Sequence, residues 1–331
     1  MPRAISKPSL VPSGLALALV VLVGAARAEP YPVRPVRIVV PTSPGGGVDF
    51  LARLIGQRLA DRLGQPFVVE NRAGAGGSIA TEHVAKAAPD GYTLELAFVG
   101  QLAMLPHVQK VEYNALNDFV GVSLLASSYH VLVVNPSVPA RTATELIALA
   151  KRRPGELNYA SCDAWSPSHL VPEIFKAATG TDILRIQYKG CGPATLGMLS
   201  GEAQIMFGSP TPVMPYVRAN RLVALAVTSP ARLPEAPEVP TLVEAGVSNI
   251  GDAQTWYALI APAATPRDVI VGLHTEIVKI AAMPEYQAAL EAQGLEPKSS
   301  TPEEFAAFLR LDYDKWGKVI SPLKDSGALA R

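Results

Sequence analysis

No stretch of this 331-residue sequence is long and apolar enough to cross a membrane. The most apolar run, Gly14 to Val23, has about ten residues, whereas a spanning helix needs about twenty. It follows the basic residues Arg3 and Lys7 and precedes a site of small residues, Ala26-Arg27-Ala28, an order typical of a cleaved signal peptide. We therefore predict that residues 1–28 are a signal peptide of an exported protein; an uncleaved membrane anchor is the alternative.

Neither sign of charge is in excess. The chain has 29 Lys and Arg residues against 29 Asp and Glu residues, and the predicted signal peptide holds three of the basic residues and no acid. The mature chain is therefore slightly acidic and lacks the basic surface that nucleic-acid binding requires, so no nucleic-acid partner is expected. The residue directly after the predicted cleavage site is Glu29 and not a cysteine, so a lipid anchor is not expected either.

The spacings that mark metal, nucleotide and catalytic sites are also missing. The five histidines have no metal-ligand spacing: His83, His107, His130, His169 and His274. Gly74-Ala75-Gly76 begins like a dinucleotide fingerprint, but Ile79 takes the place of the third glycine. No G-x-S-x-G nucleophile turn is present. These absences predict a protein with no metal, no cofactor and no catalytic activity. The alternative is an exported serine hydrolase in which Ser161 or Ser166 acts with His169.

What the sequence does contain is a glycine-rich turn between a strand and a helix. Residues 36–40 are an apolar strand, residues 41–47 are the turn, and residues 48–63 have helical apolar spacing that ends at Gly64. The N–H groups and dipole at such a helix N-terminus favour an anion. Because no phosphate-loop lysine follows, we expect a carboxylate rather than a nucleotide phosphate; a tight turn without a ligand is the alternative.

The rest of the chain alternates strand-like and helical segments. Further strands are expected at residues 67–69, 92–98, 132–134, 157–160, 183–188, 203–207 and 222–227, with helices mostly between them. The last third is expected to be mainly helical, at residues 267–282, 285–293 and 302–319, the last with a cap at Thr301. The alternation predicts an α/β fold with a parallel sheet flanked by helices, and about 300 residues predict two domains.

Ligand sites in open parallel sheets lie beyond the C-terminal ends of the strands. The loops expected there, at residues 41–49, 73–78, 99–103, 161–168, 189–193 and 208–212, are rich in Gly, Ser, Thr and Pro. They offer N–H and hydroxyl donors, which predicts a binding cleft rather than a catalytic one. Ser78, and either Ser166 or Ser168, are interpreted as helix N-caps. Trp256 and Tyr257 lie in a strand-like run, where core packing and ligand contact both remain open.

Cys162 and Cys191 are the only two cysteines. An even number in an exported protein favours a disulfide. Each follows a predicted strand end, so their loops lie side by side if those two strands are neighbours. The alternative is a pair of unbridged, buried thiols.

Taken together, the segments from Tyr31 to about Val319 resemble the Bug family, the periplasmic receptors of tripartite tricarboxylate transporters. The matching segments stand in order at residues 31–41, 44–49, 69–77, 85–94, 157–161 with 168–170, 188–190 and 225–229. So many collinear matches are far more specific than any one of them.

The resemblance implies a periplasmic, type II-like binding protein with two domains, each a mainly parallel sheet flanked by helices, and a cleft between them. Residues 29–127 with 230–331 would form the first domain and residues 128–229 the second. The ligand would be a small organic carboxylate, typically a dicarboxylate, passed to an inner-membrane tripartite permease, and we expect a monomer. The residues expected to contact the ligand are Ser43, Pro44, Gly45, Gly46, Gly47, Asp49, Ala75, Gly76, Ser78, Gly100, Gln101, Tyr129, His130, Ser161, Trp165, Ser166, Ser168, His169, Tyr188 and Ser209.

The chain departs from the family pattern in the expected cleft. It has Asp163-Ala164-Trp165-Ser166 where many relatives have Asn-Gly-Thr/Ser, and Tyr129-His130 where Pro-Asn is common. Gly208 replaces an aspartate that could meet a ligand amine, and Pro172 stands where a small helix residue is usual, which could displace the helix start. These changes argue against an amino-acid ligand and lean towards an aromatic or longer dicarboxylate, such as a terephthalate-like acid.

Overall fold

The computed structural model describes residues 1, 4, 31–247 and 253–325. Contacts between Cα atoms divide the chain into two compact units, residues 1–31 and residues 32–331, and the description below concerns the second. The predicted signal peptide lies, apart from Met1 and Ala4, outside the described residues. Among the residues that the structure does describe, no helix combines the length and the apolar character of a membrane span.

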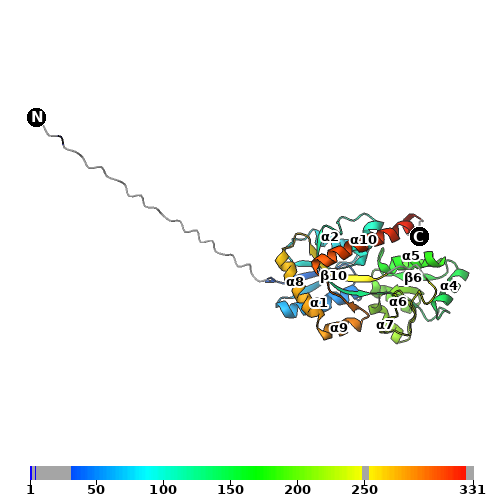
Figure 1. The fold of residues 1–331 in the computed structure, drawn as a ribbon. Coiled ribbons are helices and arrows are strands. Elements are labelled where there is room, and N and C mark those ends of the chain that lie inside the picture. Colours follow the sequence, from blue (N-terminus) through cyan, green and yellow to red (C-terminus); the bar gives the residue numbers. More distant parts are fainter. Residues whose placement is uncertain (2–3, 5–30, 248–252, 326–331) are drawn as a thin grey trace. The chain divides into compact units, whose positions relative to one another are not determined.

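Strands and helices alternate along most of this unit, as the apolar spacing predicted (Figure 1). The strands are β1 (Val36–Val40), β2 (Phe67–Asn71), β3 (Thr93–Phe98), β4 (Phe119–Ser128), β5 (Val131–Val134), β6 (Asn158–Ser161), β7 (Leu184–Gln187), β8 (Ile205–Gly208), β9 (Val223–Val227), β10 (Thr255–Pro262) and β11 (Glu296–Pro297). The helices are α1 (Gly47–Leu63), α2 (Ser78–Ala85), α3 (Leu105–Val108), α4 (Ala143–Arg152), α5 (Pro167–Thr179), α6 (Cys191–Ser200), α7 (Pro210–Arg218), α8 (Arg267–Ala281), α9 (Pro284–Glu291) and α10 (Pro302–Asp325). Two short turns are also helical, η1 (Ala75–Gly77) and η2 (Gly100–Met104).

The strands form two sheets. The first has the order β11-β4-β10-β3-β1-β2, and the second has the order β7-β6-β8-β5-β9. In the first, β1 pairs in parallel with β2 and β3. In the second, β6 pairs in parallel with β7 and β8. Helices α4, α5, α6 and α7, green in Figure 1, accompany the second sheet, whereas α1, α8 and α10 lie with the first.

One inner strand of each sheet runs against its neighbours. β10 is antiparallel to β3 and β4, and β5 is antiparallel to β8 and β9. Strands reached through a helical crossover within one sheet run parallel. β5 instead follows β4 from the first sheet after only Tyr129 and His130, and β10 begins the return to that sheet, so neither strand enters through such a crossover. β11 is also antiparallel to β4, so each sheet is mixed, with parallel pairs towards one edge and antiparallel pairs towards the other.

Apolar burial holds helices on the sheets. Leu51, Ile55 and Leu59 of α1 are fully buried at the helical spacing read from the sequence. On the second sheet, Phe175 of α5 packs on Phe207 of β8 with 5.3 Å between ring centroids. The opposite face of that sheet carries a separate core cluster to which α6 and α7 contribute. These layers fix where the loops at the strand ends emerge.

Several local predictions need correction. Ser78 is the first residue of α2, and Gly77, with φ of 98°, occupies the cap position without a side-chain bond, so the Ser78 cap is wrong. Residues 99–103 are helical rather than a loop, because η2 continues into α3. β4 was not among the predicted strands, and the last helix continues to Asp325 through Pro322.

Other local predictions are confirmed. The N–H of Glu304 donates to Thr301 Oγ1 at 3.1 Å, and the N–H of Thr301 donates to Glu304 Oε2 at 2.8 Å, a reciprocal capping box. Ser166 holds the N-cap position of α5, although its side chain makes no capping bond. Pro172 lies inside α5, which begins at Pro167.

Candidate functional site

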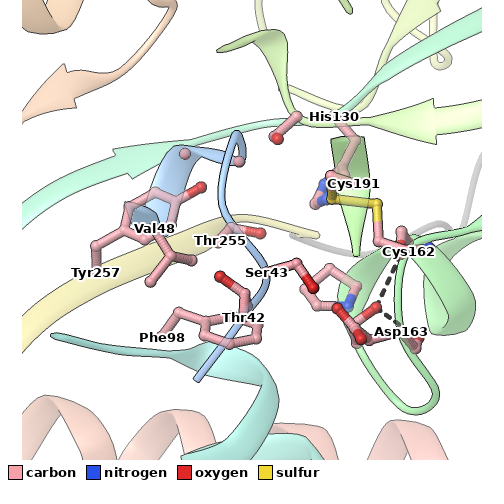
Figure 2. Close-up of a pocket in the computed structure, with 16 residues that line it drawn as sticks. Thr42, Ser43, Val48, Phe98, His130, Cys162, Asp163, Cys191, Thr255 and Tyr257 are labelled. Atoms are coloured by element: carbon pink, nitrogen blue, oxygen red, sulfur yellow. Dashed lines mark hydrogen bonds between the residues drawn. A yellow bond between two sulfur atoms is a disulfide. The ribbon is translucent and has the colours of Figure 1, made fainter. Parts of the chain in front are cut away.

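A cavity of about 60 Å³ lies where loops from both sheets converge, and it has room for only a few water molecules or a small ligand. From the first sheet and its helices it is lined by Thr42, Ser43, Gly46, Gly47, Val48, Phe98, Thr255 and Tyr257. From the second it is lined by His130, Cys162, Asp163, Ser166, Pro167, Ser168, Cys191 and Ser209. Figure 2 shows the loop from Thr42 to Val48 on one side and the Cys162–Cys191 disulfide with Asp163 on the other.

The N-terminus of α1 supplies backbone donors to this cavity. The N–H groups of Gly46 and Gly47 donate to no other described residue, as expected for the first turn of a helix. A Cβ on Gly47 would lie 3.1 Å from the hydroxyl oxygen of Tyr257, so a side chain there would crowd the cavity wall. Gly45 has φ of 91°, a conformation that glycine adopts without strain. The glycines thus let a helix of 17 residues point its positive end into the cavity.

Asp49 stabilises the conformation of this loop through hydrogen bonds. Its carboxylate accepts hydrogen bonds from the Gly45 N–H at 3.1 Å, from Arg53 Nη2 at 2.8 Å and from Asn71 Nδ2 at 2.9 Å. Burial by itself would raise the pKa of Asp49, but the bonds from Arg53, Asn71 and Gly45, with the Arg53 charge, hold it below its ordinary value. Asp49 is not among the lining residues of the cavity, and its hydrogen bonds position the loop.

Two buried hydroxyls at the cavity have no hydrogen-bond partner among the described residues, Thr42 Oγ1 and Thr255 Oγ1. The Tyr257 hydroxyl lies 3.2 Å from Ser128 Oγ, and burial raises the Tyr257 pKa to about 12, so it stays protonated at neutral pH. Buried polar atoms are nearly always satisfied in native proteins. These orphaned hydroxyls therefore point to a bound polar group.

His130 brings a neutral imidazole to the cavity. The side chain is 3% exposed, and burial lowers its pKa to about 4 against a hydrogen bond with the backbone of Ala253. The ring is therefore neutral at neutral pH, and its Nδ1 has no hydrogen-bond partner among the described residues.

Asp163, which follows β6, is the only carboxylate among the lining residues of the described cavity. No hydrogen bond or ion pair joins its side chain to another described residue, although its backbone carbonyl accepts bonds from Ser161 Oγ and Ser166 Oγ. Burial alone raises the pKa of Asp163 to about 7. A carboxylate such as Asp163 that has no described cationic or hydrogen-bond partner is unusual in a cavity expected to bind an anion, because like charges repel.

The predicted disulfide is confirmed. β6 and β7 are parallel neighbours, with Ser161 paired to Gln187, and the chain reaches Cys162 and Cys191 just beyond their ends. The two cysteines are bonded with 4.4 Å between their Cα atoms. Both line the cavity, so the bond also forms part of its wall.

The geometry of a serine hydrolase is not present. Ser161 Oγ and Ser166 Oγ both donate to the carbonyl oxygen of Asp163, at 3.1 and 2.9 Å, and neither bonds His169 in the described structure. His169 Nδ1 accepts the N–H of Trp165 at 3.1 Å, and Arg185 Nη1 lies 2.7 Å from Nε2. Burial and the nearby charge of Arg185 lower the His169 pKa to about 3, which disables it as a base at neutral pH.

The predicted site residues divide into two groups. Those that line the cavity are Ser43, Gly46, Gly47, His130, Ser166, Ser168 and Ser209. Those that lie outside its lining are Pro44, Gly45, Asp49, Ala75, Gly76, Ser78, Gly100, Gln101, Tyr129, Ser161, Trp165, His169 and Tyr188.

Two of the residues outside the lining have clear structural roles. Trp165 packs on His169 with 4.8 Å between ring centroids. Gln101 is fully buried, and its Nε2 donates to Glu95 at 3.1 Å.

Seven lining residues outside the disulfide were not predicted from the sequence, namely Thr42, Val48, Phe98, Asp163, Pro167, Thr255 and Tyr257. Thr42, Val48 and Asp163 are neighbours of predicted residues in the same loops. Thr255 and Tyr257 share one face of their strand, because residues two apart in a strand point to the same side. The strand-like run therefore indicated that they would act together.

Loops from the two sheets also touch each other around the cavity. Ser43 Oγ donates to the carbonyl oxygen of Lys189 at 2.8 Å, and Thr211 Oγ1 donates to that of Gln293 at 3.1 Å. A Cβ on Gly76 would lie 2.8 Å from the carbonyl oxygen of Ala164. The second-sheet loops therefore rest on the first-sheet loops at several points.

Two mixed sheets flanked by helices, with loops that converge on a small cavity with hydrogen-bond donors, define a solute-binding protein. This chain belongs to the receptors of the tripartite tricarboxylate transporter family: the family model described as "Tripartite tricarboxylate transporter family receptor" matches residues 51–324. The chain is thus a solute-binding receptor of a transporter family with periplasmic members, and the serine hydrolase alternative is wrong because this is not an enzyme family. The resemblance to the Bug family and the α/β fold class are both confirmed.

Individual relatives agree along nearly their whole length. Protein BugT of Bordetella pertussis is 37% identical over 321 residues, which cover 95% of this chain and 96% of that protein. A solved "periplasmic transporter" is 39% identical with a TM-score of 0.85, covering 88% of this chain and 97% of that one. Rpa4515 of R. palustris, solved with adipate, is 33% identical with a TM-score of 0.85; the match covers 90% of this chain and 98% of that one.

Proposed function

We propose that this receptor captures a small organic carboxylate in the cavity at the N-terminus of α1 and delivers it to an inner-membrane tripartite permease. The observation that carries the proposal is the set of donors without partners, the N–H groups of Gly46 and Gly47 beside the buried hydroxyls of Thr42 and Thr255. A carboxylate accepts several such bonds, and the helix dipole adds to them. Adipate in the related Rpa4515 supports the same class of ligand.

The proposal includes the predicted cleavage of residues 1–28, a periplasmic location and a monomeric state. It also includes the predicted division into residues 29–127 with 230–331 and residues 128–229, with closure of the two parts on the ligand. The two sheets support this division, because the chain passes from β4 to β5 through Tyr129 and His130. The bond from Ser43 to Lys189 would then form on closure.

The finer ligand preference has less support than the class. The predicted preference for an aromatic ligand depends on Trp165 and Tyr129, which do not line the cavity. Two other aromatic residues, Phe98 and Tyr257, do line it. The resemblance favoured a dicarboxylate, but the N-terminus of α1 accounts for one carboxylate only. The aromatic and dicarboxylate preferences therefore enter the experiment as separate panels of ligands.

A thermal-unfolding screen followed by calorimetry tests the proposal. A ligand at one hundred times its dissociation constant stabilises the folded state by about 2.7 kcal/mol, which for a chain of this size means several degrees of melting shift. We expect that shift with aliphatic or aromatic carboxylates. We expect little shift with neutral sugars or with the amides of the same carboxylic acids. If only sugars or amides raised the melting temperature, the carboxylate assignment would be wrong.

A further inference from the structure

The polar groups of the cavity differ between its two sides. The first-sheet side presents donors and hydroxyls at Gly46, Gly47 and Thr255. The second-sheet side presents the Asp163 carboxylate, which is partly buried and receives no hydrogen bond from a described residue, and the buried His130 Nδ1, which has no described partner either. A ligand whose only polar group is one carboxylate would satisfy the first side and offer no donor to Asp163.

We propose that Asp163 accepts a hydrogen bond from the ligand, so that the receptor selects a carboxylate bearing a hydroxyl over one bearing a second carboxylate. The inference rests on the carboxylate function proposed above. It assigns the specificity to Asp163, and it replaces the dicarboxylate expectation.

Charge argues against a second carboxylate at this place. Burial raises the Asp163 pKa to about 7 and lowers that of His130 to about 4. Above pH 8, Asp163 is therefore an anion, so a ligand carboxylate beside it would face a like charge without a donor. A hydroxyl would donate its single hydrogen with no such repulsion.

An ammonium group is the other donor to consider, and the surroundings favour the hydroxyl. An ammonium has three hydrogens to place and a large desolvation cost. The nearby hydroxyls are already engaged, since Ser166 Oγ lies 2.8 Å from Ser168 Oγ, and Ser168 Oγ accepts the N–H of Cys162. Much of the remaining wall is apolar, with Phe98, Pro167 and the disulfide.

Calorimetric titration at pH 8.5 with two matched series of acids tests this inference. The four-carbon series is butyrate, 4-hydroxybutyrate, 4-aminobutyrate and succinate; the six-carbon series is hexanoate, 6-hydroxyhexanoate, 6-aminohexanoate and adipate. Within the better-fitting series we expect the hydroxy acid to bind about tenfold more tightly than both the unsubstituted acid and the diacid, the size of effect that one bond to a charged group gives.

Two variants assign the effect to Asp163. Asp163→Leu keeps the branched shape, at a larger volume, without an acceptor, so the hydroxyl advantage should disappear while the unsubstituted acid still binds. Asp163→Asn adds an amide donor, so the diacid should gain about tenfold relative to the hydroxy acid. Asp182→Asn, an exposed acid outside the cavity lining, is the matched control and should change no ratio.

The outcomes separate the two proposals. Equal or tighter binding of the diacid by the unmodified protein, tighter binding of the amino acid, or a hydroxyl advantage that survives Asp163→Leu would each overturn the role of Asp163 and leave the carboxylate function standing. If no acid of either series bound, while an uncharged solute did, the carboxylate function itself would fall and this inference with it.

Discussion

Ser43, in the loop after β1, donates a hydrogen bond from Oγ to the backbone carbonyl oxygen of Lys189 at 2.8 Å, which joins the first-sheet side of the cavity to the second. Gly190 follows Lys189 with φ of 107°, and a Cβ there would lie 2.6 Å from Ser43 Cβ. The two loops can approach this closely only because residue 190 has no side chain.

Gly190→Ala should weaken ligand binding by at least about tenfold, because the added methyl group would push the Ser43 loop away from the cavity rim. Gly180→Ala is the control: it also has a positive φ, 63°, but nothing lies within 4 Å of its Cβ. Gly180→Ala should lose about 1 kcal/mol of stability from its left-handed backbone. Gly190→Ala should lose more, because its ψ of 166° puts it in a region nearly restricted to glycine, and only Gly190→Ala should lose affinity in calorimetry. Equal affinity in the two variants would show that this contact does not contribute to binding.

Gly46→Asp should abolish carboxylate binding with the fold intact. The nearest atom to a Cβ on Gly46 is Cys191 Cβ at 3.8 Å, so the side chain fits, but its charge would occupy the place proposed for the ligand anion. Gly272→Asp places the same substitution on the exposed face of α8, where nothing lies within 4 Å, and should bind as the unmodified protein does. Unchanged affinity of Gly46→Asp would contradict the assignment of the anion site to α1.

The disulfide should contribute about 3–4 kcal/mol to stability, since it closes a loop across a separation of 29 residues. We expect no titratable thiol in denatured, unreduced protein from the periplasm. Cys162→Ser with Cys191→Ser should lower the midpoint of urea unfolding and also weaken ligand binding, because both cysteines line the cavity. Two free thiols per chain, or a double variant of unchanged stability, would contradict this.

Glu95 should make stability depend on pH between about 4.5 and 7. Its carboxyl is fully buried and accepts bonds from Thr81 Oγ1 at 2.8 Å and Gln101 Nε2 at 3.1 Å, yet burial raises its pKa from 4.5 to about 7. The folded state thus holds a proton that the unfolded state has released. This stability is fully present below pH 4.5 and is lost as the pH rises to 7.

Glu95→Gln removes that titration and keeps an oxygen for both donors. Relative to the unmodified protein, the variant should gain on the order of 3 kcal/mol between pH 4.5 and pH 8, measured by urea unfolding at several pH values. Glu238→Gln, at an exposed position, should show no such gain. A difference between Glu95→Gln and the unmodified protein that stays constant with pH would show that Glu95 is ionised throughout.

The sequence by itself determined the features that depend on neighbours along the chain. The turn from β1 into α1 follows from its glycines, and the capping box of α10 follows from Thr301 and Glu304, because dihedral preference and capping act within a few residues. The pairing of Cys162 with Cys191 was also accessible, since each follows a strand and consecutive parallel strands tend to be neighbours.

Only the tertiary structure decided which side chains meet at the cavity. In β10, Tyr257 faces the cavity, while its neighbour Trp256 faces the core and donates to Asp312 at 2.7 Å. Alternation along a strand separates the two, but it cannot say which face is which until β10 is placed between β3 and β4.

The same holds for Trp165 and Asp163, two residues apart in one loop. The sequence favoured the aromatic residue as the ligand contact, which stays a prediction; in the structure Trp165 packs on His169, and Asp163 lines the cavity. A loop residue's orientation depends on what the rest of the fold packs against it, here α5 and the disulfide. Local sequence therefore specified the loop and its donors, and the long-range packing of two sheets specified which of its groups line the cavity.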